Sequence, residues 1–206
     1  MRQQIFFIRH GETAWSKAGR HTGRTDILLN APGRAAARRL QARLATIAFR
    51  HVFVSPRRRA AETCDLAGVG TDAEIEPDLE EWDYGSYEGR RSGEIHAERP
   101  RWNIFRDGCP GGESPARIAA RADRLIARLR GLSGAIALFS HGHFGRVLAA
   151  RWIGLPVRSG EHFLLGTASV SVLGYEPKPG GPPVISLWNE PGPAESSRPK
   201  RRASRT

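Results

Sequence analysis

The sequence predicts an α/β fold in which a mostly parallel sheet is flanked by helices. Two observations support this prediction. Short apolar runs, each with the length of a buried strand, alternate along the chain with longer segments in which apolar residues recur at helical spacing. The length of 206 residues also suffices for one such domain with a full core and is short for two.

The first buried strand is predicted over the apolar run at residues 5–8. It ends abruptly in Arg9, His10 and Gly11, so the strand places two basic side chains at its carboxyl end, where open α/β sheets bind ligands. Gly11 lets the backbone approach a ligand closely, and its N–H group can point at an anion. An isolated Arg-His pair would be an ordinary surface feature, but at this position it favours a phosphate site.

The next segments alternate between loop, helix and strand. Residues 13–30 contain several glycines and show no sustained period, which predicts a loop across the carboxyl edge of the sheet. Residues 34–46 repeat alanine, leucine and arginine at helical spacing and predict a helix. A short buried strand is predicted at 52–54, followed by Ser55 as the N-cap of a helix over 57–67.

The second half of the chain begins with a long irregular segment. Residues 68–113 scatter aromatic side chains among charges and glycines, and a structured insertion of this length is usually functional. Beyond it the pattern predicts two helices, over 114–131 and 144–153, and three strands, over 135–139, 170–175 and 184–189, the last two as a closing hairpin-like pair.

The end of the chain cannot bury a core. Proline, serine, glycine and arginine dominate residues 191–206, so we expect one domain at 1–190 and a disordered basic tail after it. The net charge is +11, and five of these charges lie in 198–205, which leaves 11 − 5 = +6 for the rest. Nine other arginines recur at helical spacing and are expected on solvated faces: Arg34, Arg38, Arg39, Arg43, Arg117, Arg121, Arg124, Arg128 and Arg130.

Several protein classes are disfavoured. There is no secretory signal and no run of eighteen apolar residues, so we expect a cytoplasmic protein that does not bind membranes. Cys64 and Cys109 are expected to be reduced, and neither is followed by the arginine that a cysteine phosphatase needs. The chain has no P-loop motif. His141 and His143 lack further ligands at familiar spacing, so no metal site is predicted.

Four blocks of the sequence together resemble one family. Arg9-His-Gly-Glu-Thr13 is the signature of the histidine phosphatase superfamily, the phosphoglycerate-mutase-like proteins. The other three blocks follow in the family's order: Ser55-Pro-Arg-Arg-Arg-Ala-Ala-Glu-Thr63, Asp78-Leu-Glu-Glu-Trp-Asp-Tyr-Gly-Ser-Tyr-Glu-Gly89 and Phe139-Ser-His-Gly-His143. The resemblance covers most of the chain and implies a three-layer sandwich and a phosphohistidine enzyme.

The resemblance also implies individual roles. It implies five catalytic residues. His10 is the nucleophile, Glu81 is the proton-transfer group, and Arg9, Arg59 and His141 are hydrogen-bond donors to the phosphate. Position 57 is an arginine where the family often has leucine, which leaves Arg57 and Arg58 as expected bystanders. Glu80, Asp83 and Glu88 are then structural or solvated carboxylates.

Phosphoryl transfer requires these residue types. Charge develops on the equatorial oxygens of the phosphoryl group, so catalysis depends on positioning and on cationic donors such as the planar fork of arginine. His10 must be neutral to attack phosphorus, and we expect nearby cations to lower its pKa and a backbone carbonyl to fix its tautomer. Glu81 must donate a proton to the leaving alkoxide and later accept one from water.

Two further blocks, 10–26 and 102–113, resemble the sedoheptulose-1,7-bisphosphatase-like branch of the family. Mutases usually have asparagine where Ser16 stands and carry a longer insertion before the second histidine. By resemblance to that branch, five residues are expected to bind the substrate: Ser16, Thr22, Gly23, Tyr84 and Arg146, the last as a candidate for a second phosphate or for sugar hydroxyls.

The sequence therefore predicts a metal-independent phosphatase that uses no cofactor and acts on small phosphorylated metabolites such as sugar bisphosphates. Two alternatives stay open. A cofactor-dependent phosphoglycerate mutase would retain the phosphoryl group and require a primer. A nucleic-acid-binding protein would use the basic surface, would lose binding with added salt, and would leave the residues around His10 without a role. The sequence does not specify an oligomeric state.

Overall fold

A computed structural model describes residues 3–192 of the chain. Within these residues, six strands form one sheet in the order β3-β2-β4-β1-β5-β6. The strands are β1 (Gln4–Arg9), β2 (Phe49–Val54), β3 (Glu74–Ile75), β4 (Ala135–Ser140), β5 (Ser169–Tyr175) and β6 (Pro183–Pro191). The pairings β1–β4, β2–β4 and β2–β3 are parallel, whereas β5 runs antiparallel to both β1 and β6. The predicted α/β fold is thus confirmed.

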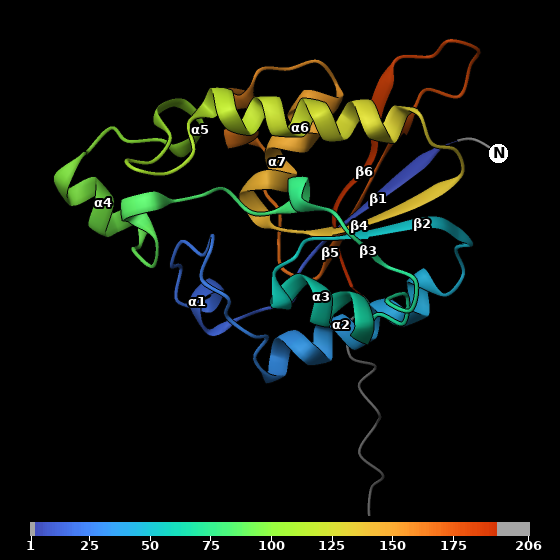
Figure 1. Ribbon diagram of the computed structural model, residues 1–206, viewed down its shortest axis with the longest axis horizontal. Coiled ribbons are helices and arrows are strands. Elements are labelled where there is room, and N and C mark those ends of the chain that lie inside the picture. Colours follow the sequence, from blue (N-terminus) through green and yellow to red (C-terminus); the bar gives the residue numbers. More distant parts are fainter. Residues whose placement is uncertain (1–2, 193–206) are drawn as a thin grey trace, which may run out of the picture.

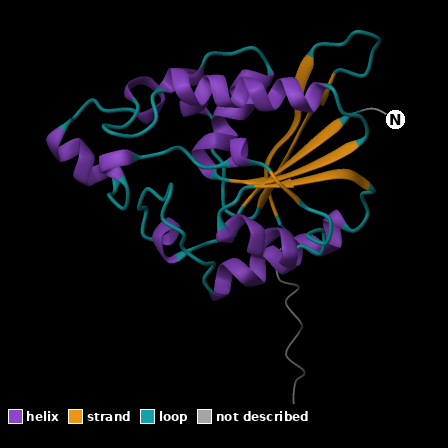
Figure 2. Ribbon diagram, viewed as in Figure 1, coloured by secondary structure: helices purple, strands orange, loops and turns teal. Residues whose placement is uncertain are grey.

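Helices cover both faces of this sheet. The helices α6 (Pro115–Arg130) and α7 (Gly142–Trp152) lie on one face, and α2 (Ala31–Leu44) and α3 (Arg58–Leu66) lie on the other (Figure 1). Figure 2 shows the resulting three layers, with the strands between the two groups of helices. No helix in residues 3–192 combines the length and the apolar character needed to cross a bilayer.

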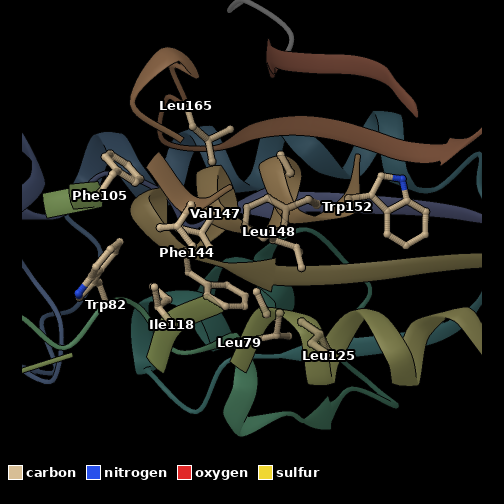
Figure 3. Packing of buried hydrophobic residues seen from close by; sticks show 14 of the residues in the cluster. Leu79, Trp82, Phe105, Ile118, Leu125, Phe144, Val147, Leu148, Trp152 and Leu165 are labelled. Atoms are coloured by element: carbon tan, nitrogen blue, oxygen red, sulfur yellow. The ribbon is translucent and has the colours of Figure 1, made fainter. Parts of the chain in front are cut away.

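The two faces of the sheet bury separate apolar clusters. Alternate side chains of a strand point to opposite faces, so Ile5 and Phe7 of β1 pack with α6 and α7, whereas Phe6 and Ile8 pack with α2 and α3. Figure 3 shows the first cluster, in which side chains of α6 meet those of α7. Each such fully buried side chain contributes about 1.5–3 kcal/mol of transfer free energy, which fixes the helices against the sheet.

The expected loop and the expected irregular segment both contain short elements. Within 13–30, Thr13 and Ser16 form a capping box that starts the short helix α1 (Ala14–Lys17). The segment 68–113 contains β3, two 3₁₀ turns and two short helices: η1 (Pro77–Leu79), η2 (Gly85–Tyr87), α4 (Ser92–Glu98) and α5 (Ile104–Asp107). A further 3₁₀ segment, η3 (Val157–His162), follows α7. In Figure 1, α1, α4 and α5 gather beside the sheet rather than on its faces.

Some predicted boundaries were wrong. Helix α3 begins at Arg58 with Arg57 as its N-cap residue, so Ser55 is not the N-cap. Helix α2 begins earlier than expected, because the side chain of Asn30 accepts the N–H of Gly33 and caps the helix. The last strand extends to Pro191, and residues 193–206 of the predicted tail lie outside the described part of the chain.

The parallel strands bring distant residues to one edge of the sheet. Arg9 lies opposite Ser140 in the β1–β4 register, and the β2–β4 register places Val54 opposite Phe139. The next residues continue this pairing, since the His10 N–H donates to the Ser140 carbonyl over 2.9 Å. The residues that directly follow β1, β2 and β4 therefore lie side by side at the carboxyl edge.

Candidate active site

His10 lies at the centre of this edge. Its side chain is buried, and its Nδ1 lies 2.7 Å from the carbonyl oxygen of Gly11. Nδ1 therefore carries the ring proton of the neutral imidazole, and the lone pair is on Nε2. Burial, followed by the charges of Arg59 and Arg9, holds the pKa of His10 well below its usual value. The structure thus places a neutral histidine here, with its tautomer fixed by a backbone carbonyl as predicted.

Arg59 and His141 form a hydrogen-bonded pair beside His10. The fully buried Arg59 donates from Nε to Nδ1 of His141 over 3.2 Å. Nε2 of His141 therefore carries the proton, and it donates to the hydroxyl of Ser55 over 2.7 Å. Burial is the main reason that the pKa of His141 is also well below its usual value. Both ring nitrogens of His141 are engaged, so in this arrangement it orients Arg59 and offers no N–H group to a phosphate.

The remaining N–H groups of Arg59 hold the loop that follows α1. Nη2 donates to the carbonyls of Thr22 and Gly23 over 3.0 and 2.9 Å, and Nη1 donates to the carbonyl of Thr25 over 3.0 Å. A guanidinium has five N–H groups. Four of them have these partners within residues 3–192, which leaves one for a ligand.

Arg9 reaches the site from the end of β1. Its Nη1 donates to the carbonyl of Leu165, whereas its Nε is buried and has no hydrogen-bond partner among the described residues. The guanidinium packs against the start of α7, where a Cβ at Gly142 would lie 3.1 Å from Cζ of Arg9. An unpartnered buried N–H group is costly, and the Arg9 side chain that carries it lines the cavity described below.

The Glu81 carboxyl group is fixed at the N-terminus of α7. Its Oε2 accepts the N–H of His143 over 3.0 Å, and its Oε1 accepts the N–H groups of Phe144 and Trp82 over 2.8 and 2.9 Å. The N-cap residue of α7, His141, makes no capping bond of its own. Glu81 therefore satisfies helix N–H groups that would otherwise lack partners, and this fixes the position of its carboxyl group.

These groups surround a cavity of about 230 Å³. Of the predicted residues, seven line it: Arg9, His10, Ser16, Thr22, Glu81, Tyr84 and Arg146. Arg59 and His141 lie behind its surface. No three histidine, cysteine or carboxylate side chains within residues 3–192 gather into a metal-binding group. A neutral histidine, cationic donors and a fixed carboxyl group in one small cavity are the elements needed for phosphoryl transfer.

The comparison with known families agrees with this geometry. The family model described as Histidine phosphatase superfamily (branch 1) matches residues 5–191. The chain belongs to this superfamily. The resemblance inferred from the sequence blocks is therefore confirmed.

Individual relatives of this histidine phosphatase are similar over most of their lengths. An acid phosphatase of Mycobacterium tuberculosis is 41% identical over 194 residues, which cover 92% of this chain and 95% of the relative. Sedoheptulose 1,7-bisphosphatase of Saccharomyces cerevisiae is 37% identical over 192 residues, which cover 75% of this chain and 69% of the relative. A solved structure of a Mycobacterium tuberculosis open-reading-frame product has a TM-score of 0.88 at 37% identity and covers 93% of this chain and 100% of that chain. The predicted enzyme class, a phosphomonoesterase of this superfamily, is thus confirmed.

Gly11 and Gly23 were expected to contact the ligand, but their N–H groups bind other residues of the protein. Gly23 is not on the cavity surface, because its N–H donates to the Glu88 carboxylate over 2.9 Å and its carbonyl accepts from Arg59. The N–H of Gly11 donates to the Thr63 hydroxyl over 3.0 Å and so does not point at an anion. A Cβ at Gly11 would lie 2.6 Å from the carbonyl oxygen of Gly33, so the glycine permits close packing of the backbone of α2 rather than of a ligand.

The predicted bystanders lie outside the cavity of the histidine phosphatase. Arg57 pairs with Glu80 over 2.9 Å and donates to the carbonyl of Arg24 over 3.0 Å. Arg58 uses its backbone N–H to bind Asp26 over 2.9 Å. Three consecutive arginines at a helix start are therefore accommodated by acids, by carbonyl groups and by His141.

The cavity of the histidine phosphatase also has lining residues that the sequence did not reveal. His21 and His143 are buried there, and the Tyr84 hydroxyl lies 2.7 Å from Nδ1 of His143. The ring of His21 packs on that of Tyr84, with 4.7 Å between the centroids. Burial lowers the pKa of His21 to about 4 and that of His143 well below its usual value, and it raises the pKa of Tyr84 well above its usual value. His21, Tyr84 and His143 therefore contribute an aromatic part of the cavity wall that is uncharged at neutral pH.

Arg20, which also lines the cavity, was missed. Its Nη1 donates to the carbonyl of Gly89 over 2.6 Å, and its backbone forms a bridge with Arg91. Nothing in its local sequence distinguishes it from the many other arginines of the chain. By contrast, the sequence could have indicated His143, because it is the last residue of the second histidine motif and lies at the start of α7, close to the end of β4.

Proposed function

We propose that this histidine phosphatase hydrolyses small phosphomonoesters without a metal ion, through a phosphohistidine on His10. The observation that carries the proposal is the hydrogen bond from Nδ1 of His10 to Gly11, which leaves the lone pair of the buried imidazole on Nε2. A nucleophile that is already neutral and oriented needs no separate base to activate it. The guanidinium of Arg9 lines the same cavity as His10 and supports binding of the phosphoryl group there.

In the first half-reaction, Nε2 of His10 attacks phosphorus and the bond from phosphorus to the ester oxygen breaks. The leaving oxygen takes a proton from the Glu81 carboxyl group. Arg9 and the remaining N–H group of Arg59 stabilise the charge on the equatorial oxygens. The products of this step are the free alcohol, the phosphohistidine and the Glu81 carboxylate.

In the second half-reaction, water attacks the phosphorus of the phosphohistidine and the bond from phosphorus to Nε2 breaks. The water gives one proton to the Glu81 carboxylate, which restores the acid, and inorganic phosphate leaves with the remaining hydroxyl group. The balance is one ester and one water consumed for one alcohol and one phosphate. One carboxyl group serves both steps, as microscopic reversibility allows.

The preferred substrates are sugar phosphates with a second anionic group, such as sedoheptulose 1,7-bisphosphate. Arg146 supports this, since Nε and Nη2 donate to the carbonyls of Gly160 and Glu161 over 2.9 and 3.0 Å, and Nη1 has no hydrogen bond among residues 3–192 and is left for a ligand. A second cavity of about 440 Å³ shares Arg146, His21, Ser92 and His143 with the first and extends the space beyond the site of phosphoryl transfer. The yeast relative, a sedoheptulose 1,7-bisphosphatase, favours the same substrate class.

We further propose that the partners are limited to such phosphorylated substrates, without nucleic acid, and that the enzyme acts in the cytoplasm. Several helix arginines that could form a basic surface are paired with acids. Arg124 pairs with Asp78 over 2.8 Å, and Arg128 pairs with Glu74 over 2.6 Å. Such pairing reduces the positive field that non-specific binding of nucleic acid requires.

The proposal is tested by phosphate release in EDTA from sedoheptulose 1,7-bisphosphate, fructose 1,6-bisphosphate and 3-phosphoglycerate, with wild-type enzyme and His10→Ala. We expect metal-free release from the bisphosphates that the substitution abolishes. Primer-dependent interconversion of phosphoglycerates without release would identify a mutase instead. Salt-sensitive binding of nucleic acid without either reaction would identify the non-enzymatic alternative.

A further inference from the structure

Arg121 differs from the other arginines of α6. The helical spacing predicted a solvated side chain, but the side chain is only 11% exposed. It lies on the same side of the helix as the buried Ile118 and Leu125 and reaches the segment that precedes and includes Glu81. The expectation of a solvated arginine was therefore wrong at this position.

The guanidinium of Arg121 binds three backbone carbonyl groups of that segment. Nη1 donates to the carbonyl oxygens of Asp78 and Glu80 over 2.9 and 2.6 Å, and Nη2 donates to the carbonyl oxygen of Glu81 over 3.3 Å. A planar group with fixed donor directions can bind three carbonyl oxygens only if the backbone that carries them holds one conformation. The backbone that carries Glu81 is thereby fixed.

Glu113 fixes the guanidinium in turn. Its Oε1 and Oε2 accept from Nε and Nη2 of Arg121 over 3.1 and 2.8 Å, a two-point contact between side chains that are each 11% exposed. The backbone of Glu113 binds the same region, because its N–H donates to the carbonyl of Asp83 and its carbonyl accepts Nε1 of Trp82, both over 2.8 Å. Residues on both sides of Glu81 are thus tied to one ion pair.

Arg121 also contacts the group that holds the Glu81 carboxyl. Its Cζ lies 4.5 Å from the centroid of the Phe144 ring, and the N–H of Phe144 donates to Oε1 of Glu81 over 2.8 Å. One side chain therefore contacts both the backbone of Glu81 and the residue that positions its carboxyl oxygen. No other cation on α6 has this arrangement within residues 3–192.

We propose that Arg121, held by Glu113, is a positioning residue that keeps the Glu81 carboxyl in place for proton transfer to the leaving group. This inference rests on the role of Glu81 in the proposed function. A general acid must lie within hydrogen-bond reach of the leaving oxygen, and a displacement of about 1 Å can cost roughly 100-fold in rate. Lysine in place of Arg121 keeps the charge but loses the planar fork that binds carbonyls and carboxylate together.

Two substrates separate this role from a merely structural one. The alkoxide leaving group of a sugar phosphate is a strong base and needs the proton from Glu81. The leaving group of 4-nitrophenyl phosphate is a weak base and departs without one. The parameter kcat/KM covers the steps up to formation of the phosphohistidine, so it reports this difference without the later hydrolysis.

The experiment measures kcat/KM for both substrates, with the sugar phosphate taken as the one that the wild type hydrolyses fastest. The variants are Arg121→Met, Arg121→Lys, Glu113→Gln, Glu81→Gln and the double variant Glu81→Gln/Arg121→Met. The matched control is Arg124→Met, which removes an exposed arginine of the same helix that binds only the side chain of Asp78. Thermal unfolding verifies that each variant folds, and if Arg121→Met does not, Arg121→Lys and Glu113→Gln carry the test.

We expect Arg121→Met to lose about 10- to 100-fold on the sugar phosphate and less than about threefold on 4-nitrophenyl phosphate, with smaller losses of the same kind in Arg121→Lys and Glu113→Gln. Added to Glu81→Gln, it should cause no further loss, since it acts through Glu81. Equal losses on both substrates, an additive loss in the double variant, or no loss would overturn the proposal.

The failure of the proposed function has a different signature. Absence of phosphate release by the wild type, or a Glu81→Gln variant that treats both substrates alike, would refute the role of Glu81 before Arg121 is considered. A Glu81→Gln variant that is selective, together with an Arg121→Met variant that is not, would refute only the role of Arg121.

Discussion

Ser55 and His141, 86 residues apart in the chain, are joined by a hydrogen bond of 2.7 Å between the serine hydroxyl and Nε2 of the histidine. Arg59 donates to Nδ1 of His141, so the ring proton is on Nε2, and the Ser55 hydroxyl accepts it and holds the ring in this orientation. The orientation of the buried arginine thus depends on a hydroxyl group at the end of a neighbouring strand.

Replacement of Ser55 by alanine should therefore affect both stability and rate. The substitution leaves a buried N–H of His141 without a partner, which costs about 1–3 kcal/mol of unfolding free energy. We also expect kcat for phosphate release to fall about tenfold, because Arg59 loses its fixed partner. Urea denaturation and steady-state kinetics measure the two effects. The control is Ser86→Ala, at an exposed position, and a Ser55→Ala variant as stable as this control would refute the argument.

Gly142→Ala should displace Arg9. The added Cβ would lie 3.1 Å from Cζ and 3.2 Å from Nε of the guanidinium, which must then move away from the start of α7. We expect weaker inhibition by inorganic phosphate and a loss of about 10- to 100-fold in kcat/KM. Gly93→Ala is the matched control, since a Cβ at that helical glycine meets nothing within 4 Å. Equal phosphate inhibition of the two variants would contradict the prediction.

The protonation state of His10 can be observed directly. Burial and the charges of Arg59 and Arg9 lower its pKa, so the folded protein should keep it neutral at pH values where an ordinary histidine, with a pKa of about 6.5, is already charged. Nitrogen NMR of the labelled protein should show Nδ1 protonated and Nε2 bare, with the signal assigned through His10→Asn. Protonation of His10 near the value found in the urea-unfolded protein would show that the charges do not act as described.

Stability should fall with acid. His10, His21, His141 and His143 all have folded-state pKa values below the unfolded value, so the unfolded state binds more protons and their contribution is lost as the pH falls below about 6.5. For His21, whose pKa falls to about 4, the loss down to that pH is on the order of 3 kcal/mol. Urea denaturation at a series of pH values measures it, and His21→Gln should flatten the curve. A curve unchanged by that substitution would exclude His21 as a source.

Arg146→Ala should reduce the preference for bisphosphates. Arg146 lines both cavities, and a charged hydrogen bond to a second phosphate contributes about 1.5–3 kcal/mol. We expect kcat/KM for fructose 1,6-bisphosphate to fall about 10- to 100-fold, with little change for 4-nitrophenyl phosphate. Arg151→Ala on the same helix is the control, because Arg151 pairs with Asp123 outside both cavities. A uniform loss on both substrates would assign Arg146 to the fold instead.

The sequence predicted a residue's position well where the evidence for it lies in the neighbouring residues of the chain. Arg9 and His10 follow an apolar strand directly, so their place at the sheet edge could be read from nine residues of sequence. Ser55 shows the limit of such signals. A serine before a proline at a helix start is typical of an N-cap, and only the β2–β4 register shows that its hydroxyl meets His141 instead.

Arg121 and His21 were missed for different reasons. Arg121 shares the helix face of Ile118 and Leu125, and this spacing could have marked it as buried, although its carbonyl partners on another segment could not be predicted. His21 lies in a loop without periodicity. Its ring meets Tyr84, which is more than sixty residues further along the chain, and this contact exists only because the two loops converge beside the sheet.

The two ends of the substrate site are carried by different parts of the molecule. His10, Arg59 and His141 lie at the carboxyl edge of the sheet, whereas His21, Tyr84 and the lining residues of α4 and α5 stand on segments beside it, some of which also pack in the core of α6 and α7. Substitutions of the lining side chains that do not pack in this core can therefore select a new alcohol without loss of the phosphoryl chemistry. This separation makes the fold easy to diversify by evolution, and it makes the same segments the first place to randomise when the enzyme is redesigned for another ester.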